Sequence, residues 1–116
     1  MSSQTKSISE QGLHFGEWLR RLRDAKELTL REVAAAAEMD MTHLSKAERG
    51  QRLLTEEQTA KLAQFFQVDP KEAQARRMVE KFREEGEGNP EAAREAVCML
   101  AEEAGIYRTE SKKGGK

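Results

Sequence analysis

The sequence has 116 residues, of which 35% are charged and 37% hydrophobic, so it can form one modest domain with a small core and an appendage. The net charge of −1 at pH 7 excludes a strong overall attraction to polyanions, so any such attraction would need a local basic patch. No apolar run approaches the roughly 20 residues that span a bilayer, and the N-terminus lacks the apolar stretch of a signal peptide. The single cysteine, Cys98, excludes an internal disulfide and favours a reducing cytoplasm.

The first predicted helix follows a short polar segment. Residues 1–12 are small and polar, and we expect them to form a flexible N-terminal arm. After them, no stretch alternates hydrophobic and polar residues over the length of a strand, so the expected fold class is all-α. One helical face is indicated by hydrophobic residues spaced i, i+3, i+4 and i+7, namely Phe15, Trp18, Leu19 and Leu22.

Thr29 and Glu32 begin a second helix as a capping box. In this motif the threonine hydroxyl accepts a hydrogen bond from a backbone amide of the first turn, and the glutamate accepts one from the threonine amide. The inner face of this helix is narrow and consists of Val33, Ala34 and Ala37. The run of alanines at residues 34–37 would let another helix approach closely.

A third, short helix follows a break at residues 38–40. Asp40 can cap its N-terminus, because aspartate is a favoured N-cap residue. We expect the helix to run to about Arg49 and to end at Gly50, since glycine readily adopts the left-handed conformation found after many helices.

Two further helices have similar start signals. Thr55 and Gln58 form a second capping box, and Asp69 precedes Pro70, a residue favoured at the first helical position. The fourth helix is expected to bury Leu62, Ala63, Phe65 and Phe66. The fifth has an apolar stripe of Ala75, Met78, Val79 and Phe82.

The sixth helix lies beyond a glycine-rich break at residues 86–88. It begins at Asn89 and Pro90 and ends at Gly105. Its apolar stripe consists of Ala93, Ala96, Val97, Leu100 and Ala104. Cys98 lies beside this stripe and is interpreted as a small buried or interface residue. Residues 107–116 are expected to form a flexible tail.

The third helix has two different faces. Leu44 and Ala47 point toward the expected core, and the opposite arc contains Met41, Thr42, Ser45, Lys46 and Arg49. Such a face can enter a DNA major groove, where lysine donates to guanine and a methyl or thioether group contacts the thymine methyl. Arg49 and Arg52 can bind phosphates. The alternative is a solvated helix end whose cations interact favourably with the helix dipole.

The segment FGEWLRRLRDAKELTLREVAAAAEMDMTHLSKAERG resembles the helix-turn-helix domain of the Cro and phage-repressor (XRE) transcriptional regulators. The resemblance covers about residues 13–69, and its most specific parts are LSKAERG and TLREVA. It implies a five-helix repressor-like DNA-binding domain with the third helix in the major groove. The C-terminal helical extension, residues 70–106, lies outside the resemblance.

The resemblance also implies residue roles. The expected base contacts are Met41, Thr42, Ser45 and Lys46, and the expected phosphate contacts are His43, Arg49 and Arg52. Arg23 and Glu48 match a pair that often forms a partly buried salt bridge in the family. Leu30 stands where the family often has a phosphate-binding glutamine. Glu38 stands where the family often has a turn glycine, and it would need a left-handed backbone if that geometry is kept.

The function implied is sequence-specific binding of an inverted-repeat operator by a homodimeric regulator, a repressor, in the cytoplasm of a prokaryote or encoded by a phage. The expected dimer interface consists of Met78, Val79, Phe82, Val97 and Leu100. The alternative is an antitoxin-like or anti-regulator module whose C-terminal helices bind a partner protein. The histidines and the cysteine lack zinc-site spacing, and no nucleophile–base pair or phosphate loop is evident. We therefore expect no metal, no cofactor and no enzymatic activity.

Overall fold

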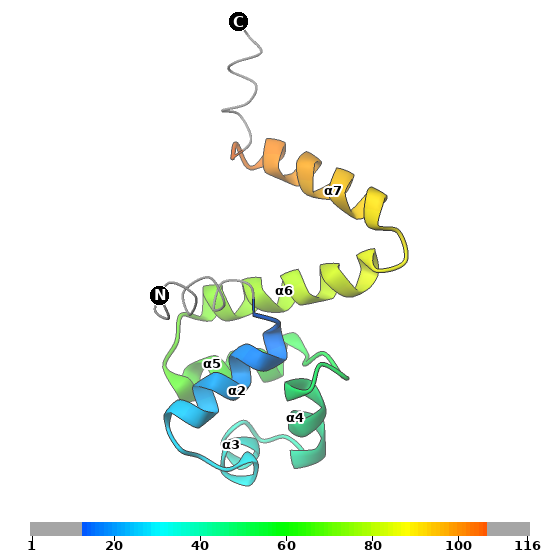
Figure 1. Ribbon diagram of the computed structural model, residues 1–116. Helices are drawn as coiled ribbons and strands as arrows, with labels where there is room; N and C mark the ends of the chain where they lie inside the picture. The colour runs from blue at the N-terminus through cyan, green and yellow to red at the C-terminus, as the bar shows by residue number, and fades with distance from the viewer. Residues whose placement is uncertain (1–12, 107–116) are drawn as a thin grey trace, which may run out of the picture. The chain divides into compact units, whose positions relative to one another are not determined.

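The computed structural model of the chain describes residues 13–106, so the expected N-terminal arm and C-terminal tail lie outside the described residues. Within that range the all-α prediction is confirmed, because the described elements are all helices and no strand is present. Figure 1 labels the helices α2 (Phe15–Ala25), α3 (Leu30–Ala36), α4 (Met41–Glu48), α5 (Glu56–Phe66), α6 (Pro70–Gly86) and α7 (Pro90–Glu103).

Both predicted capping boxes are formed. The amide of Glu32 donates to the Thr29 hydroxyl at 3.1 Å, and the Thr29 amide donates to the Glu32 carboxylate at 2.8 Å. At the start of α5 the corresponding two distances between Thr55 and Gln58 are both 3.0 Å. These hydrogen bonds satisfy amides that have no partner within their helix, and they explain why α3 and α5 begin where they do.

Side chains also cap α6 and α7, but not α4. Asp69 accepts a hydrogen bond from the Lys71 amide at 2.9 Å, and Asn89 accepts one from the Ala92 amide at 3.1 Å. Asp40 occupies the predicted N-cap position of α4, yet its side chain makes no capping hydrogen bond, so that part of the prediction is wrong. The third residue of α4 is His43, which offers no carboxylate for a reciprocal capping box, and Asp40 is exposed to water.

The chain divides into two compact units, with the boundary after Lys81 inside α6. In the first unit, Figure 1 shows α2 and α5 in the middle, with α3 and α4 on one side and the first part of α6 on the other. The helices enclose one hydrophobic core, made of Phe15, Trp18, Leu19, Val33, Ala34, Ala37, Leu44, Ala47, Leu54, Leu62, Ala63, Phe66 and Ala73.

The α5 side chains show which positions reach this core. Thr59, Leu62, Ala63 and Phe66 are buried, at spacings i, i+3, i+4 and i+7. Phe65 lies off this stripe and is 37% exposed, so the prediction that it would be buried is wrong. Its ring packs against the edge of the Phe66 ring, with centroids 5.2 Å apart.

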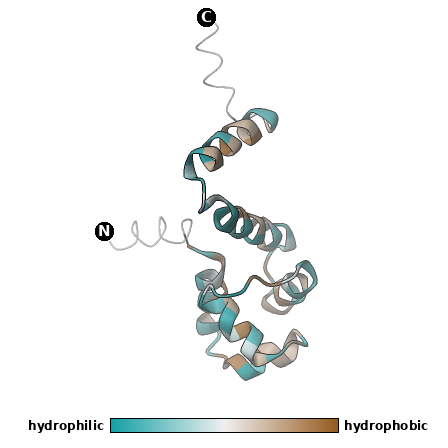
Figure 2. Cartoon of the chain, turned by 90° about the vertical axis from the view of Figure 1, so that its right-hand side faces the viewer, coloured by the Kyte–Doolittle hydropathy of each residue, from teal (hydrophilic) through white to brown (hydrophobic). Residues whose placement is uncertain are grey.

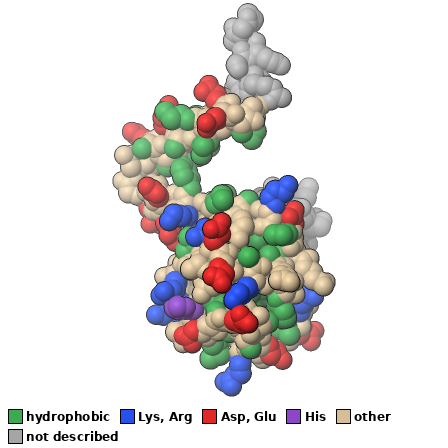
Figure 3. All heavy atoms as spheres, turned by 180° about the vertical axis from the view of Figure 1, so that it is seen from behind, with side chains coloured by type: hydrophobic (Ala, Val, Ile, Leu, Met, Phe, Trp, Pro, Cys, Tyr) green, Lys and Arg blue, Asp and Glu red, His purple; other side chains and the backbone are tan. Residues whose placement is uncertain are grey.

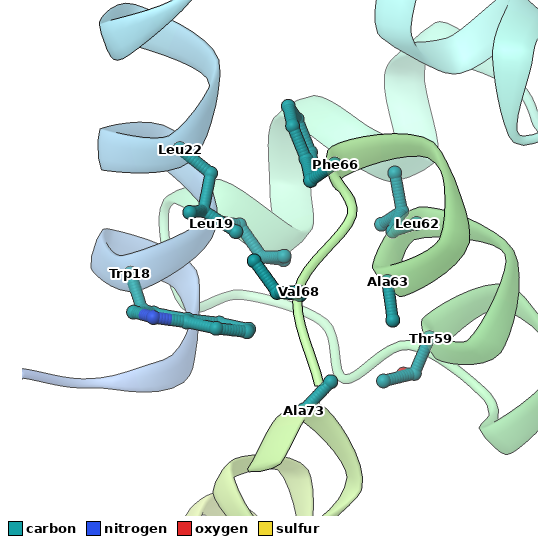
Figure 4. A pocket seen from close by; sticks show the side chains of 9 residues that line it. All are labelled: Trp18, Leu19, Leu22, Thr59, Leu62, Ala63, Phe66, Val68 and Ala73. Carbon is teal, nitrogen blue, oxygen red and sulfur yellow. The ribbon is translucent and has the colours of Figure 1, made fainter. Parts of the chain in front are cut away.

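The beginning of α6 joins the core through Ala73, a residue outside its predicted apolar stripe. Figure 4 shows the Ala73 side chain directed toward residues of α2 and α5, among them Trp18 and Thr59. The predicted stripe faces elsewhere, since Met78 is 59% exposed and Val79 is also exposed. Packing of that stripe on the first unit is therefore not what holds α6 in place.

Polar side chains attach α6 to the first unit instead. The Arg77 guanidinium donates to the Leu54 carbonyl at 2.8 Å, and the Gln74 amide nitrogen donates to the Glu56 carbonyl at 3.0 Å. The Arg76 guanidinium lies 4.8 Å from the Trp18 ring centroid, within the range of a cation–π interaction. This face of α6 is thus largely charged, although it packs on the domain.

The second unit contains the end of α6 and all of α7. Gly86 lies so close to α7 that an added Cβ atom would be 2.7 Å from the Cβ of Ala93. None of the α7 residues is buried, and Leu100 is 57% exposed. Figure 2 shows hydrophobic and hydrophilic residues mixed along α7, whereas α6 is mostly hydrophilic.

Candidate nucleic-acid interface

α3 and α4 are joined by a tight turn at residues 37–40. Glu38 has a φ of 56°, so the left-handed turn is kept although the residue is not glycine. Hydrogen bonds from the Glu38 amide to the Ala35 carbonyl (3.1 Å) and from the Met39 amide to the Ala34 carbonyl (2.9 Å) close the end of α3. They fix the direction in which the chain enters α4.

The end of α4 has the same geometry with a glycine. Gly50 has a φ of 77°, and its amide donates to the Ala47 carbonyl at 3.1 Å. The following amide, of Gln51, donates to the Lys46 carbonyl at 2.9 Å. The predicted helix end at Gly50 is confirmed. The two hydrogen bonds also fix the start of the loop that contains Arg52.

The faces of α4 divide as the helical wheel predicts. Leu44 and Ala47 are fully buried in the core. Met41, Thr42 and Lys46 are exposed, as are Arg49 and Arg52 just after the helix. Two other candidate contact residues, His43 and Ser45, are half-buried.

The cations among the candidate base and phosphate contacts are accessible. The Arg49 side chain folds back so that its Nε donates to the Ser45 carbonyl at 3.3 Å. Among residues 13–106, neither Lys46 nor Arg52 has a carboxylate within ion-pair distance. These two cations can therefore bind an external anion without first breaking a pair.

Glu38, an acidic residue in the turn between α3 and α4, is paired with a cation. The Glu38 carboxylate lies 2.7 Å from Lys61 Nζ, and this hydrogen bond holds the pKa of Glu38 below its ordinary value. Figure 3 shows acidic and basic side chains interspersed over one face of the molecule, without a large area of either sign. On this face, any attraction of an anionic polymer would therefore be local to the exposed cations.

An ion pair connects α2 to the last residue of α4. Arg23 Nε lies 2.8 Å from Glu48 Oε2, and Arg23 Nη2 lies 2.9 Å from Glu48 Oε1, which is a bidentate geometry. The side chains are only 15% and 6% exposed, respectively. The hydrogen bond to Glu48 raises the pKa of Arg23. Arg23 also donates to the Leu28 carbonyl at 3.0 Å, so the pair predicted from the resemblance is present and has an additional backbone partner.

A second contact between α2 and α4 was not predicted from the sequence. Gly16 is buried, and an added Cβ atom would overlap the Ala47 carbonyl oxygen and lie 2.7 Å from that of Glu48. The sequence does contain a signal, because glycine is unfavourable inside a helix and its presence beside Phe15 indicates a close backbone approach. Only glycine lets the first turn of α2 contact the end of α4 at this distance.

The described residues include an open surface hollow and a closed apolar gap, and the hollow is lined by Ala36, Glu38, Lys61, Gln64 and Phe65. The apolar gap of Figure 4, between Trp18, Leu62 and Val68, has no space for a water-sized molecule and is part of the core. No cluster of three potential metal ligands is found within residues 13–106. None of the helices in this range is long and apolar enough to cross a membrane.

One of three comparisons with known proteins agrees with this geometry. Neither the search of curated proteins nor the search of solved structures found a match. A family model described as a helix-turn-helix domain matches residues 14–75, which is more than half of the chain. The match includes α3, the turn at Glu38 and α4. The protein therefore belongs to the helix-turn-helix domain family, whose members bind DNA.

Proposed function

We propose that the protein is a sequence-specific transcriptional repressor of the XRE type that binds an inverted-repeat operator as a homodimer. One observation carries this proposal: α4 buries Leu44 and Ala47 and exposes Met41, Thr42 and Lys46. A helix anchored on one side in this way can present the other side to the major groove without disturbing the core.

The proposed contacts have two different roles. Arg49, Arg52 and the half-buried His43 bind phosphates, which position α4 and make the affinity depend on salt. Met41, Thr42, Ser45 and Lys46 read base edges, with Lys46 donating to guanine O6 or N7. The compact turn around Gly50 brings Arg49 and Arg52 to the same end of α4.

We expect Lys46→Ala to weaken binding to the best DNA site by roughly 1–3 kcal/mol and to relax base preference at defined positions. Lys46 is exposed and has no ion-pair partner within residues 13–106, so the substitution removes a base donor without disturbing a described contact. The measurement is selection from random duplexes at about physiological salt, with wild type and variant in parallel, followed by binding titrations.

Arg52→Ala provides the matched control. It also removes one exposed cation, but a phosphate contact carries no sequence information, so binding should weaken alike on all sequences and the salt slope should decrease by about one. If Lys46→Ala bound the selected site as well as wild type, Lys46 would have no role in base recognition. If wild type enriched no sequence at all, the proposed operator recognition would be wrong.

The proposed dimer interface comprises Met78, Val79, Phe82, Val97 and Leu100. Phe82 is half-buried and the other four are exposed. Figure 3 shows hydrophobic side chains of the C-terminal helices open to solvent between acidic ones. A helix as short as α7 is marginal in water without packing. A second copy would cover these side chains and would also supply the second recognition helix that an inverted repeat requires.

We expect Leu100→Glu to convert the dimer into a monomer and to reduce operator affinity at least tenfold, because a buried unpaired charge would be placed in the interface. Sedimentation and binding to whole and half operators measure the two effects. Glu95→Gln, on the side of α7 away from the apolar stripe, is the control and should leave the dimer intact. A monomeric wild type would instead favour the alternative, an antitoxin-like module whose exposed C-terminal side chains bind a different protein.

A further inference from the structure

Glu80 of α6 caps the N-terminus of α2, which lies 65 positions away in the sequence. One carboxylate oxygen accepts a hydrogen bond from the Phe15 amide at 3.0 Å. The other oxygen lies 3.0 Å from His14 Nδ1. The Glu80 side chain is only 14% exposed. The first amides of a helix lack partners within the helix and favour a negative charge, so this contact holds the first turn of α2 in place.

The same turn of α2 supports the end of α4, the proposed recognition helix. Gly16 follows Phe15 directly, and its backbone lies against the carbonyl groups of Ala47 and Glu48 at the C-terminal end of α4. A displacement of Phe15 would therefore also displace the surface on which α4 ends. Two contacts thus connect Glu80 to α4: its hydrogen bond with the Phe15 amide, and the close approach of the Gly16 backbone to the end of α4.

The helix that provides Glu80 continues beyond the first compact unit. Glu80 is followed by Lys81, the last residue of that unit, and α6 runs without a break to Gly86. The α6 residues that contact other segments of the first unit are Ala73, Gln74, Arg76, Arg77 and Glu80, and Glu80 comes last of them in the sequence.

We propose that Glu80 is a positioning residue for DNA recognition, which fixes α4 by holding the first turn of α2. This inference rests on the proposed function, in which α4 reads DNA. Glu80 makes no contact with DNA in this scheme. Its role is structural: because Glu80 lies on α6 and holds the first turn of α2, the position of α6 determines the orientation of α4.

The test compares three variants: Glu80→Ala, Glu80→Gln, and the control Glu85→Ala, which removes an exposed carboxylate from the same helix. DNA affinity is titrated at a temperature where every variant is fully folded. We expect Glu80→Ala to bind roughly fivefold more weakly, since a charge-assisted hydrogen bond is lost. Glu80→Gln keeps an acceptor for the Phe15 amide and should restore most of the affinity, while Glu85→Ala should bind as wild type.

Backbone amide spectra without DNA provide the second measurement. In Glu80→Ala we expect shifted resonances at Gly50 and Gln51, whose amides bond to carbonyls of α4, in addition to shifts near Phe15. A role in stability alone would lower the melting temperature and leave both the affinity and these resonances unchanged, which would overturn the proposal. If wild type bound no DNA, the proposed function would fail, and the Gly50 and Gln51 resonances alone would decide whether Glu80 positions α4.

Discussion

Replacing Gly16 with alanine is expected to destabilise the protein by about 3 kcal/mol or more, at the upper end of the range for overpacking. The added methyl group would overlap the Ala47 carbonyl and approach that of Glu48, and a backbone cannot move aside as a flexible side chain can. Alanine is ordinarily better than glycine inside a helix by roughly 0.5–1 kcal/mol, so the clash must exceed this gain. Chemical denaturation followed by circular dichroism measures the net effect.

Gly88→Ala is the matched control, because an added Cβ atom at Gly88 would have no neighbour within 4 Å. We expect that substitution to change the unfolding free energy by no more than about 0.5 kcal/mol, as for other surface positions. Equal stabilities of the two variants would mean that α2 does not press against α4 at Gly16. If Gly16→Ala were the less stable variant but bound DNA normally, the contact between Gly16 and α4 would be needed for folding and not for DNA recognition.

Gly16 also illustrates what the sequence does not readily reveal. The starts of α3 and α5 were predictable, because the capping residues Thr29 and Thr55 have their partners three positions away. Contacts between distant segments have no such local signature. The Gly16 contact joins α2 to α4, and the Glu80 contact joins α2 to α6, and neither follows from periodicity.

The side of α6 that packs on the other helices was not predicted, for a related physical reason. Hydrophobic periodicity selects Ala75, Met78, Val79 and Phe82 as the apolar stripe of α6, whereas the side that packs on α2 and α5 is largely charged. Arginine can pack on an aromatic ring or bond to a carbonyl, and glutamate can cap a helix, so a charged face can still be an interior face. For α4, in contrast, the inner face consists of Leu44 and Ala47, and hydropathy alone predicted it correctly.

Removing either partner of the Arg23–Glu48 pair is the other substitution with a large expected effect. Glu48 is 6% exposed, so Arg23→Ala would leave its carboxylate buried without a cation and the Leu28 carbonyl without its donor. We expect a loss of about 3 kcal/mol in unfolding free energy, as for other buried pairs that are broken on one side. Urea denaturation of the single variant and wild type measures this loss.

The double variant Arg23→Met with Glu48→Met separates two contributions of this pair to stability. One is the mutual compensation of the two charges, and the other is the packing of the two side chains. Replacing both ions removes the need to solvate either of them, so the double variant should regain most of the stability lost by Arg23→Ala. Lys61→Ala removes a surface ion pair with Glu38, which water screens, and it should change the stability far less than Arg23→Ala does. If the double variant were as unstable as Arg23→Ala, the contribution of this pair would lie in its bidentate geometry rather than in charge compensation. The pair would then act as a specific link that holds α4 against α2, and the double variant would also lose affinity for DNA.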